Sequence, residues 1–80
     1  MTVLAVFKSR SETLGYISSL RGAGVVASAV STPKEAGVGC GISARFEEGF
    51  LPRARAMLAR GNYYSFAGFL KKTNFGFTHI

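Results

Sequence analysis

The sequence is short of residues on which several classes of protein depend. It contains one cysteine and one histidine, and its four acidic residues are all glutamates. With one cysteine no internal disulfide can form, and small secreted domains usually rely on several, so a reducing cytoplasm is the expected location. One cysteine and one histidine cannot complete a structural zinc site. We therefore expect no metal and no other cofactor.

Long apolar runs are also missing. The run Val3 to Phe7 is too short for a signal peptide, and its cations follow it instead of preceding it. No stretch approaches the roughly 20 apolar residues of a membrane span. Gly22-Ala23-Gly24 and Gly37-Val38-Gly39 are not phosphate-binding loops, since neither has the required spacing and no Gly-Lys-Ser/Thr occurs. We interpret both as turns and expect a soluble intracellular protein.

What the chain does have is positive charge. Its 80 residues fit one domain, 1–80, and carry ten Lys and Arg, for a net charge of +6. Such a charge attracts nucleic acid, anionic lipid or an acidic protein partner. The cations are scattered, with no run longer than two, so the charge alone does not indicate which of these partners is bound.

The apolar pattern predicts four strands. They are expected at Thr2–Phe7, Val25–Val30, Ile42–Phe46 and Tyr63–Leu70. In the third strand Ile42, Ala44 and Phe46 share one face, which leaves Ser43 and Arg45 on a solvent-exposed face. The end of the chain, residues 70–80, has no clear period and is expected to be a tail.

Two helices are predicted between the strands. The first has Ser9 as N-cap, with the Glu12 side chain reaching back to the Ser9 amide in a capping box. It is expected to bury Leu14, Ile17 and Leu20 and to end at Gly22 or Gly24. The second has Pro52 in its first turn and ends before Gly61, with Phe50, Ala54, Met57 and Leu58 as its apolar stripe.

This order predicts the α+β class and a ferredoxin-like βαββαβ two-layer sandwich, with an antiparallel sheet and two helices on one face. The first and fourth strands put apolar groups on both faces, so something must cover the second face. Either the tail bearing Phe75, Phe77 and Ile80 folds over it, or two chains pair through their sheets. The homodimer is the favoured prediction.

The candidate reactive group is Cys40. Glycines on both sides of Cys40 allow positive φ and close approach of a ligand. In the predicted topology the third strand begins beside the end of the first, which places Cys40 near Lys8, Ser9 and the N-terminus of the first helix. A positive side chain and a helix N-terminus both favour thiolate over thiol and lower the pKa of a cysteine.

Several of these segments together resemble a small bacterial family called Putative Se/S carrier protein-like. The matching residues are Phe7-x-Ser9, the Gly24 turn, Thr32-Pro33-Lys34-Glu35, Cys40-Gly41 and Ile42-Ser43-Ala44-Arg45-Phe46. They extend over roughly Val3 to Leu58. Relatives often have serines before the cysteine, where this chain has Gly37-Val38-Gly39.

The resemblance implies a carrier that holds sulfur or selenium on Cys40, as a persulfide or selenosulfide, and exchanges it with donor and acceptor proteins. A lone cysteine suits this role because a second thiol would release the bound sulfur and close a disulfide. Lys8, Arg10 and Lys34 would steady the anionic persulfide, and the amides of Gly39, Cys40 and Gly41 would cradle it. With Ser9, Thr32 and Pro33 these residues make up the predicted site.

Two other functions stay open. The same strand order occurs in RNA-recognition domains, and the chain is basic. Such domains stack bases on aromatic residues of the first and third strands, but the exposed side of the third strand here offers Ser43 and Arg45 and no glycine-aromatic motif. The chain can also be a dimeric regulatory module that binds a small ligand, with Cys40 as a structural residue, since free cysteine is among the most buried residue types. A carrier or binding protein is favoured over a stand-alone enzyme.

Overall fold

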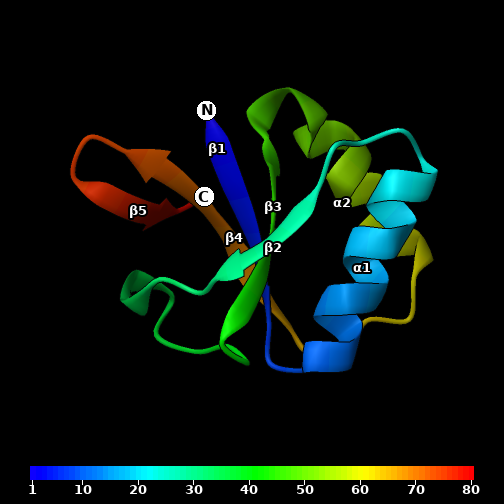
Figure 1. Cartoon of the computed structure of the whole chain (residues 1–80), viewed down its shortest axis with the longest axis horizontal. Coiled ribbons are helices and arrows are strands. Elements are labelled where there is room, and N and C mark those ends of the chain that lie inside the picture. Colours follow the sequence, from blue (N-terminus) through cyan, green and yellow to red (C-terminus); the bar gives the residue numbers. More distant parts are fainter.

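Five strands and two α-helices make up the chain, all 80 residues of which are described by a computed structural model. The elements in order are β1 (Thr2–Phe7), α1 (Arg10–Gly22), β2 (Ser28–Ser31), the 3₁₀ turn η1 (Lys34–Ala36), β3 (Ile42–Glu47), the 3₁₀ turn η2 (Glu48–Phe50), α2 (Leu51–Arg60), β4 (Phe66–Thr73) and β5 (Gly76–His79) (Figure 1). Neither α-helix has the length and apolar character needed to cross a membrane.

The strands form one antiparallel sheet in the order β2-β3-β1-β4-β5. The α+β class is confirmed, and so is the predicted antiparallel pairing of the first and third strands, with Ala5 opposite Ala44. The expected number of four strands is wrong. Residues 70–80 are not a tail, because β4 runs on to Thr73 and turns back as β5.

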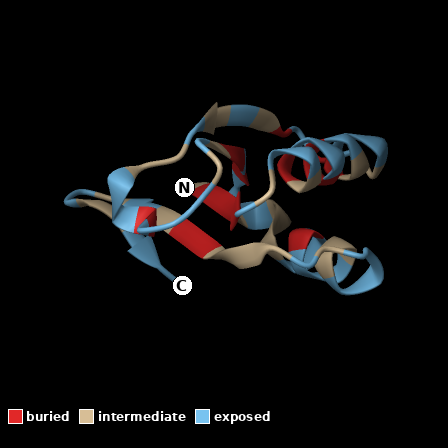
Figure 2. Ribbon diagram, turned by 90° about the horizontal axis from the view of Figure 1, so that it is seen from below, coloured by how far each residue is buried: buried red, intermediate tan, exposed pale blue.

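Both helices lie on the same face of the sheet (Figure 1). Their buried side chains pack with those of β1 and β3 in the main core, which contains Phe7, Tyr16, Leu20 and Phe46. The Phe7 ring lies 5.1 Å from the Tyr16 ring, measured between centroids. Figure 2 shows buried residues on the central strands and on the helices that cover them. The two-layer arrangement of this part of the molecule follows from that core.

The second face of the sheet is covered by the same chain. A smaller core there holds Leu4, Val6 and Leu70, with Ala36 of η1 buried against them and Phe77 of β5 packed at its edge. Of the three apolar residues in the predicted tail, only Phe77 does this, since Phe75 is 99% and Ile80 47% exposed. The apolar surface that motivated the homodimer is therefore occupied within one chain, and the homodimer stays a prediction.

Helix α1 begins at its predicted N-cap and buries two of the three residues predicted, Ile17 and Leu20. Ser9 Oγ accepts the Glu12 N–H at 3.3 Å. Leu14 is 47% exposed, and the buried residues are Thr13, Tyr16, Ile17 and Leu20. These four residues recur at intervals of three and four, which is the helical period, and Leu14 lies outside the stripe that they form. The Tyr16 hydroxyl donates to the Ala54 carbonyl at 2.7 Å, which satisfies its buried polar atom.

The end of α1 explains why the second strand starts later than predicted. Gly24 has φ +86°, its N–H donates to Arg21 O, and the N–H of Val25 donates to Leu20 O. These two bonds form a Schellman motif, in which the residue after the left-handed glycine packs on the last helical turn. Val25 is therefore buried as part of the helix cap, Val26 is 81% exposed, and the ladder begins only at Ser28.

The fourth strand starts later than predicted because the backbone just before it is hydrogen-bonded to the start of α1. It was expected from Tyr63, but the backbone N–H groups of Tyr64 and Ser65 donate to the Glu12 carboxylate at 3.0 and 2.9 Å. Glu12 therefore does not close a capping box. The Ser9 amide donates instead to Ser65 Oγ at 3.0 Å. This network joins the start of α1 to the segment before β4, which begins at Phe66.

Candidate functional site

The loop between β2 and β3 carries the only cysteine. Its base is closed by a hydrogen bond from the Thr32 N–H to Gly41 O at 3.0 Å, and by the Thr32 and Ser43 hydroxyls at 2.7 Å. Ser43 is fully buried, so its expected exposure to solvent is wrong. At Gly39, φ is +144° and a Cβ would lie 3.1 Å from Thr32 Cγ2, which only glycine avoids. The loop is thereby held close against Thr32, the residue after β2, just before Cys40.

The Cys40 side chain points to the first turn of α1. Its Sγ lies 3.4 Å from Thr13 Oγ1 and 3.4 Å from the backbone oxygen of Ile42, to which the thiol can donate. Thr13 is fully buried, whereas Cys40 is half-buried. The expected position of Cys40 beside the N-terminus of the first helix is therefore what the structure shows.

Thr13 can adapt to the charge of the sulfur. Its hydroxyl has one hydrogen and lies 3.0 Å from the carbonyl oxygen of Ser9 as well as 3.4 Å from Sγ. When Cys40 is a thiol, the hydroxyl donates to Ser9 O and the S–H donates to Thr13 or to Ile42 O. When Cys40 is a thiolate, the hydroxyl can turn to donate to the sulfur. Ser9 O does not lose its partner, because it also accepts the Thr13 N–H at 3.1 Å.

Several groups around the sulfur act on the pKa of Cys40. Burial raises that pKa, but hydrogen bonding from Thr13 and from the backbone at Ile42 and Cys40, with the positive charge of Arg10, outweighs burial. The net effect is a pKa below the usual value for a cysteine. A lowered pKa increases the thiolate fraction near neutral pH, and the thiolate is the nucleophilic form.

The other predicted residues on this side act in different ways. Arg10 contributes its charge to the thiolate, and Ser9 positions Thr13 through the helix cap. Lys8 is exposed and contributes a backbone bond to Ser65 O at 2.9 Å, while its side chain forms no ion pair. The structure thus brings Arg10 and Ser9 into the surroundings of Cys40 and assigns Lys8 no contact with the sulfur.

The remaining predicted residues form a separate depression. Thr32, Pro33, Lys34, Gly39 and Gly41, together with Gly37 and Val38, line an open cavity of about 300 Å³. Cys40 is not among the residues that line it. Because the loop turns its cysteine toward α1, the predicted binding residues fall into two groups, one beside the sulfur and one in this depression.

Sequence reasoning missed Thr13 and Ser65. Both hydroxyls lie in the network at the start of α1, where Ser65 Oγ also donates to Glu12 at 2.7 Å. A threonine four residues after an N-cap serine projects back over the first turn, which is the one signal in the sequence for Thr13. Ser65 lies 56 residues from Ser9 and had no such signal.

Fold and site together define a small basic α+β protein with one half-buried cysteine, hydrogen-bonded at the start of a helix. The family model described as Putative Se/S carrier protein-like matches residues 2–71, and the chain belongs to this family. The match runs past Leu58, where the resemblance ended, and includes the end of α2 and most of β4. No curated protein and no solved structure matches the chain.

Proposed function

We propose that this protein carries sulfur or selenium on Cys40 and passes it between a donor and an acceptor protein. The observation that carries the proposal is the contact between Cys40 Sγ and Thr13 Oγ1 at the start of α1. This contact helps to lower the pKa of a half-buried thiol. Membership in the Se/S carrier family indicates sulfur or selenium as the atom carried. The βαββαβ part of the chain is proposed to be a ferredoxin-like unit to which β5 is added.

Loading is a thiol exchange. The Cys40 thiolate attacks the outer sulfur of a donor persulfide, the S–S bond of the donor breaks, and the donor leaves as a thiolate. Cys40 then holds a persulfide with the proton that the outer sulfur brought. An outer selenium atom reacts in the same way and gives a selenosulfide. No oxidant or reductant is consumed, because one S–S bond, or one S–Se bond for selenium, forms as another breaks.

Unloading reverses the roles. An acceptor thiolate attacks the outer atom on Cys40, and Cys40 leaves as a thiolate that Thr13 can stabilise by turning its hydroxyl to the sulfur. No second cysteine is present to intercept the cargo. The chemistry calls for a reducing compartment such as the cytoplasm, where the empty thiol stays reduced.

The alternative functions have less support. RNA-recognition domains stack bases on the open face of their sheet, whereas the second face here is covered by Ala36 and Phe77. The buried Ser43 removes one of the two polar residues expected there. We therefore propose transfer partners rather than nucleic acid.

Intact-mass spectrometry tests the carrier function. The protein is incubated with glutathione persulfide, and separately with its selenium analogue, and the excess reagent is removed. We expect the mass of one sulfur or one selenium atom on the native chain and none on Cys40→Ser. Loaded protein should lose that mass when a thiol acceptor is added. A native chain that takes up nothing, under conditions in which the urea-unfolded chain is loaded, would contradict the proposal.

A further inference from the structure

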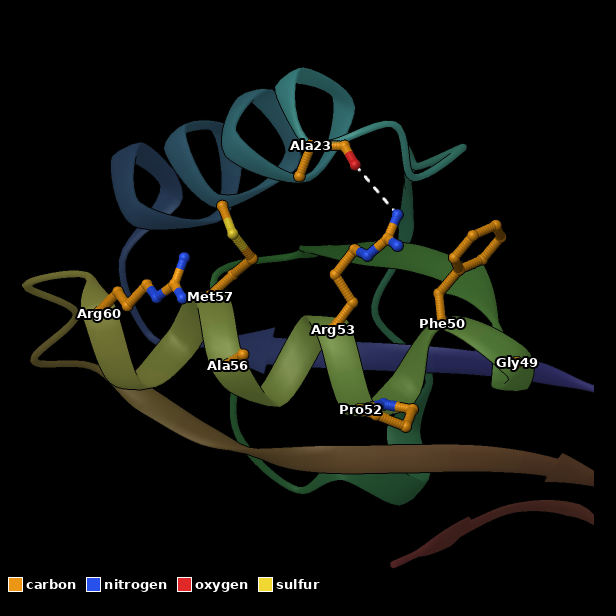
Figure 3. A pocket seen from close by; sticks show the side chains of 8 residues that line it. All are labelled: Ala23, Gly49, Phe50, Pro52, Arg53, Ala56, Met57 and Arg60. Atoms are coloured by element: carbon orange, nitrogen blue, oxygen red, sulfur yellow. Dashed lines mark hydrogen bonds between the residues drawn. The ribbon is translucent and has the colours of Figure 1, made fainter.

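A groove lies between the end of α1 and the outer side of α2, away from the cysteine. It has a volume of about 600 Å³. Arg53 and Met57 extend from α2 toward α1, with Phe50 at one end and Arg60 at the other (Figure 3). The Arg53 guanidinium donates to the carbonyl of Ala23, the C-cap residue of α1, at 3.1 Å. The sequence pattern assigned Met57 and Phe50 to the core and gave the arginines no role.

No carboxylate of the chain pairs with the positive charge of this groove. Helix α2 carries three arginines and no acidic residue. All four glutamates are engaged elsewhere, Glu12 with residues 64–65, Glu35 with the Phe77 amide, Glu47 with the N-terminus and Arg45, and Glu48 with Lys71. None of the three ion pairs includes an arginine of α2. A partner that supplies carboxylates would therefore complete this surface.

The spacing along α2 defines what such a partner looks like. Arg53, Met57 and Arg60 are separated by four and three residues, which places them on one face of the helix. At 1.5 Å per residue the two arginines are about 10 Å apart along the axis, or two turns. Met57 lies between them and is half-buried, so an apolar contact is flanked by two cations.

We propose that this groove docks an acidic amphipathic helix of a partner protein. One apolar side chain of that helix lies over Met57, and two carboxylates two turns apart pair with Arg53 and Arg60. The planar guanidinium group matches a carboxylate with two parallel hydrogen bonds, and helices laid in apolar grooves are a recurrent mode of recognition. The apolar floor at Met57 favours a peptide side chain over a phosphate backbone.

The docking surface does not depend on the proposed sulfur chemistry. Thr13, which contacts Cys40, and Ala23, which lines the groove, are ten residues apart on α1, or about 15 Å along its axis. A bound helix would therefore leave the sulfur accessible. For the same reason, Cys40→Ser should bind the partner helix as the native chain does.

Fluorescence anisotropy with a labelled peptide tests the proposal. The probe is an alanine-based helix of about 16 residues, long enough to be helical, with two glutamates two turns apart and a leucine between them. Arg60→Glu should weaken binding about fivefold, because a repulsion replaces an attraction at the rim. Arg55→Glu is the matched control. It makes the same charge change in the same helix, but Arg55 lies over the Phe69 ring, 5.1 Å away, outside the groove.

The expected pattern is specific in three ways. Arg55→Glu and Cys40→Ser bind the peptide with the native affinity. A peptide with lysines in place of the glutamates binds the Arg60→Glu variant more tightly than it binds the native chain. Replacing the leucine of the peptide by alanine weakens its binding. Equal losses for Arg55→Glu and Arg60→Glu would show general charge attraction and overturn the proposal. So would absence of binding, or an oligouridylate that binds in an Arg60-dependent way where the peptide does not.

Discussion

Replacing Thr13 by valine removes the hydroxyl beside Cys40 and should raise the pKa of the thiol. Valine keeps the shape of the side chain, which is fully buried, and loses only the polar group. The Ser9 carbonyl that accepts this hydroxyl keeps the Thr13 N–H as a partner. We therefore expect the fold to persist, with a loss of about 1 kcal/mol in stability for one hydrogen bond.

The magnitude follows from the geometry of the contact. A hydrogen bond to a charged group contributes about 1.5–3 kcal/mol, and a separation of 3.4 Å at a half-buried sulfur places this one at the lower end. Donation to the sulfur gives up the bond of about 1 kcal/mol that the same hydrogen makes to Ser9 O, so the net stabilisation of the thiolate is about 0.7 kcal/mol. Since about 1.4 kcal/mol corresponds to one pH unit, the pKa of Cys40 should rise by about half a unit. Well below the midpoint the thiolate fraction then falls about threefold. Each remaining thiolate is somewhat more nucleophilic, so the alkylation rate falls about twofold.

The assay is the rate of iodoacetamide alkylation of Cys40 as a function of pH. The native midpoint should lie below the usual cysteine value of about 8.5. Thr13→Ser should restore it because the hydroxyl returns. Ser11→Ala is a matched control, since Ser11 Oγ contacts Ser9 Oγ in the same turn and not the sulfur. An unchanged midpoint in Thr13→Val, with urea unfolding showing a folded protein, would refute the reasoning.

Three further predictions concern stability, each measured by urea unfolding. The pKa of Glu12 is lowered by hydrogen bonds from Tyr64 and Ser65. The carboxylate therefore stabilises the fold above its unfolded-state pKa, and this stabilisation is lost as the pH falls through the folded-state pKa. Glu12→Gln should be less stable than the native chain at pH 7, and the difference in stability should vanish in acid. Gly15 is exposed in α1 and nothing lies within 4 Å of an added Cβ, so Gly15→Ala should stabilise by up to about 1 kcal/mol. A loss of stability on that change would contradict the helical assignment. Phe77→Ala should lower the free energy of unfolding by about 1–2 kcal/mol, less than the loss for a fully buried phenylalanine. Phe75 is 99% exposed, so Phe75→Ala should leave the stability unchanged. Equal effects of the two changes would argue against the second core.

Prediction from the sequence succeeded where the signal is local. The first strand, the Ser9 cap, Gly24 at the end of α1 and Pro52 at the start of α2 are all as expected, because each depends on residues close together in the chain. It failed where distant groups compete for the same backbone. The fourth strand starts late because Glu12 binds the N–H groups before it. β5 was missed because it has four residues and pairs only with β4.

The sequence by itself determined that a single thiol follows a glycine-rich loop and precedes a strand, and it predicted that this strand pairs with the first. Those conclusions rest on glycine content, apolar period and element order. Only the tertiary structure decided what faces the sulfur. Because Cys40 and Thr13 are 27 residues apart, no local pattern joins them, and their contact exists only when β1, β3 and α1 are packed together. Tertiary packing also buries the second face of the sheet, where Phe77 makes a contact that its place in the sequence does not indicate.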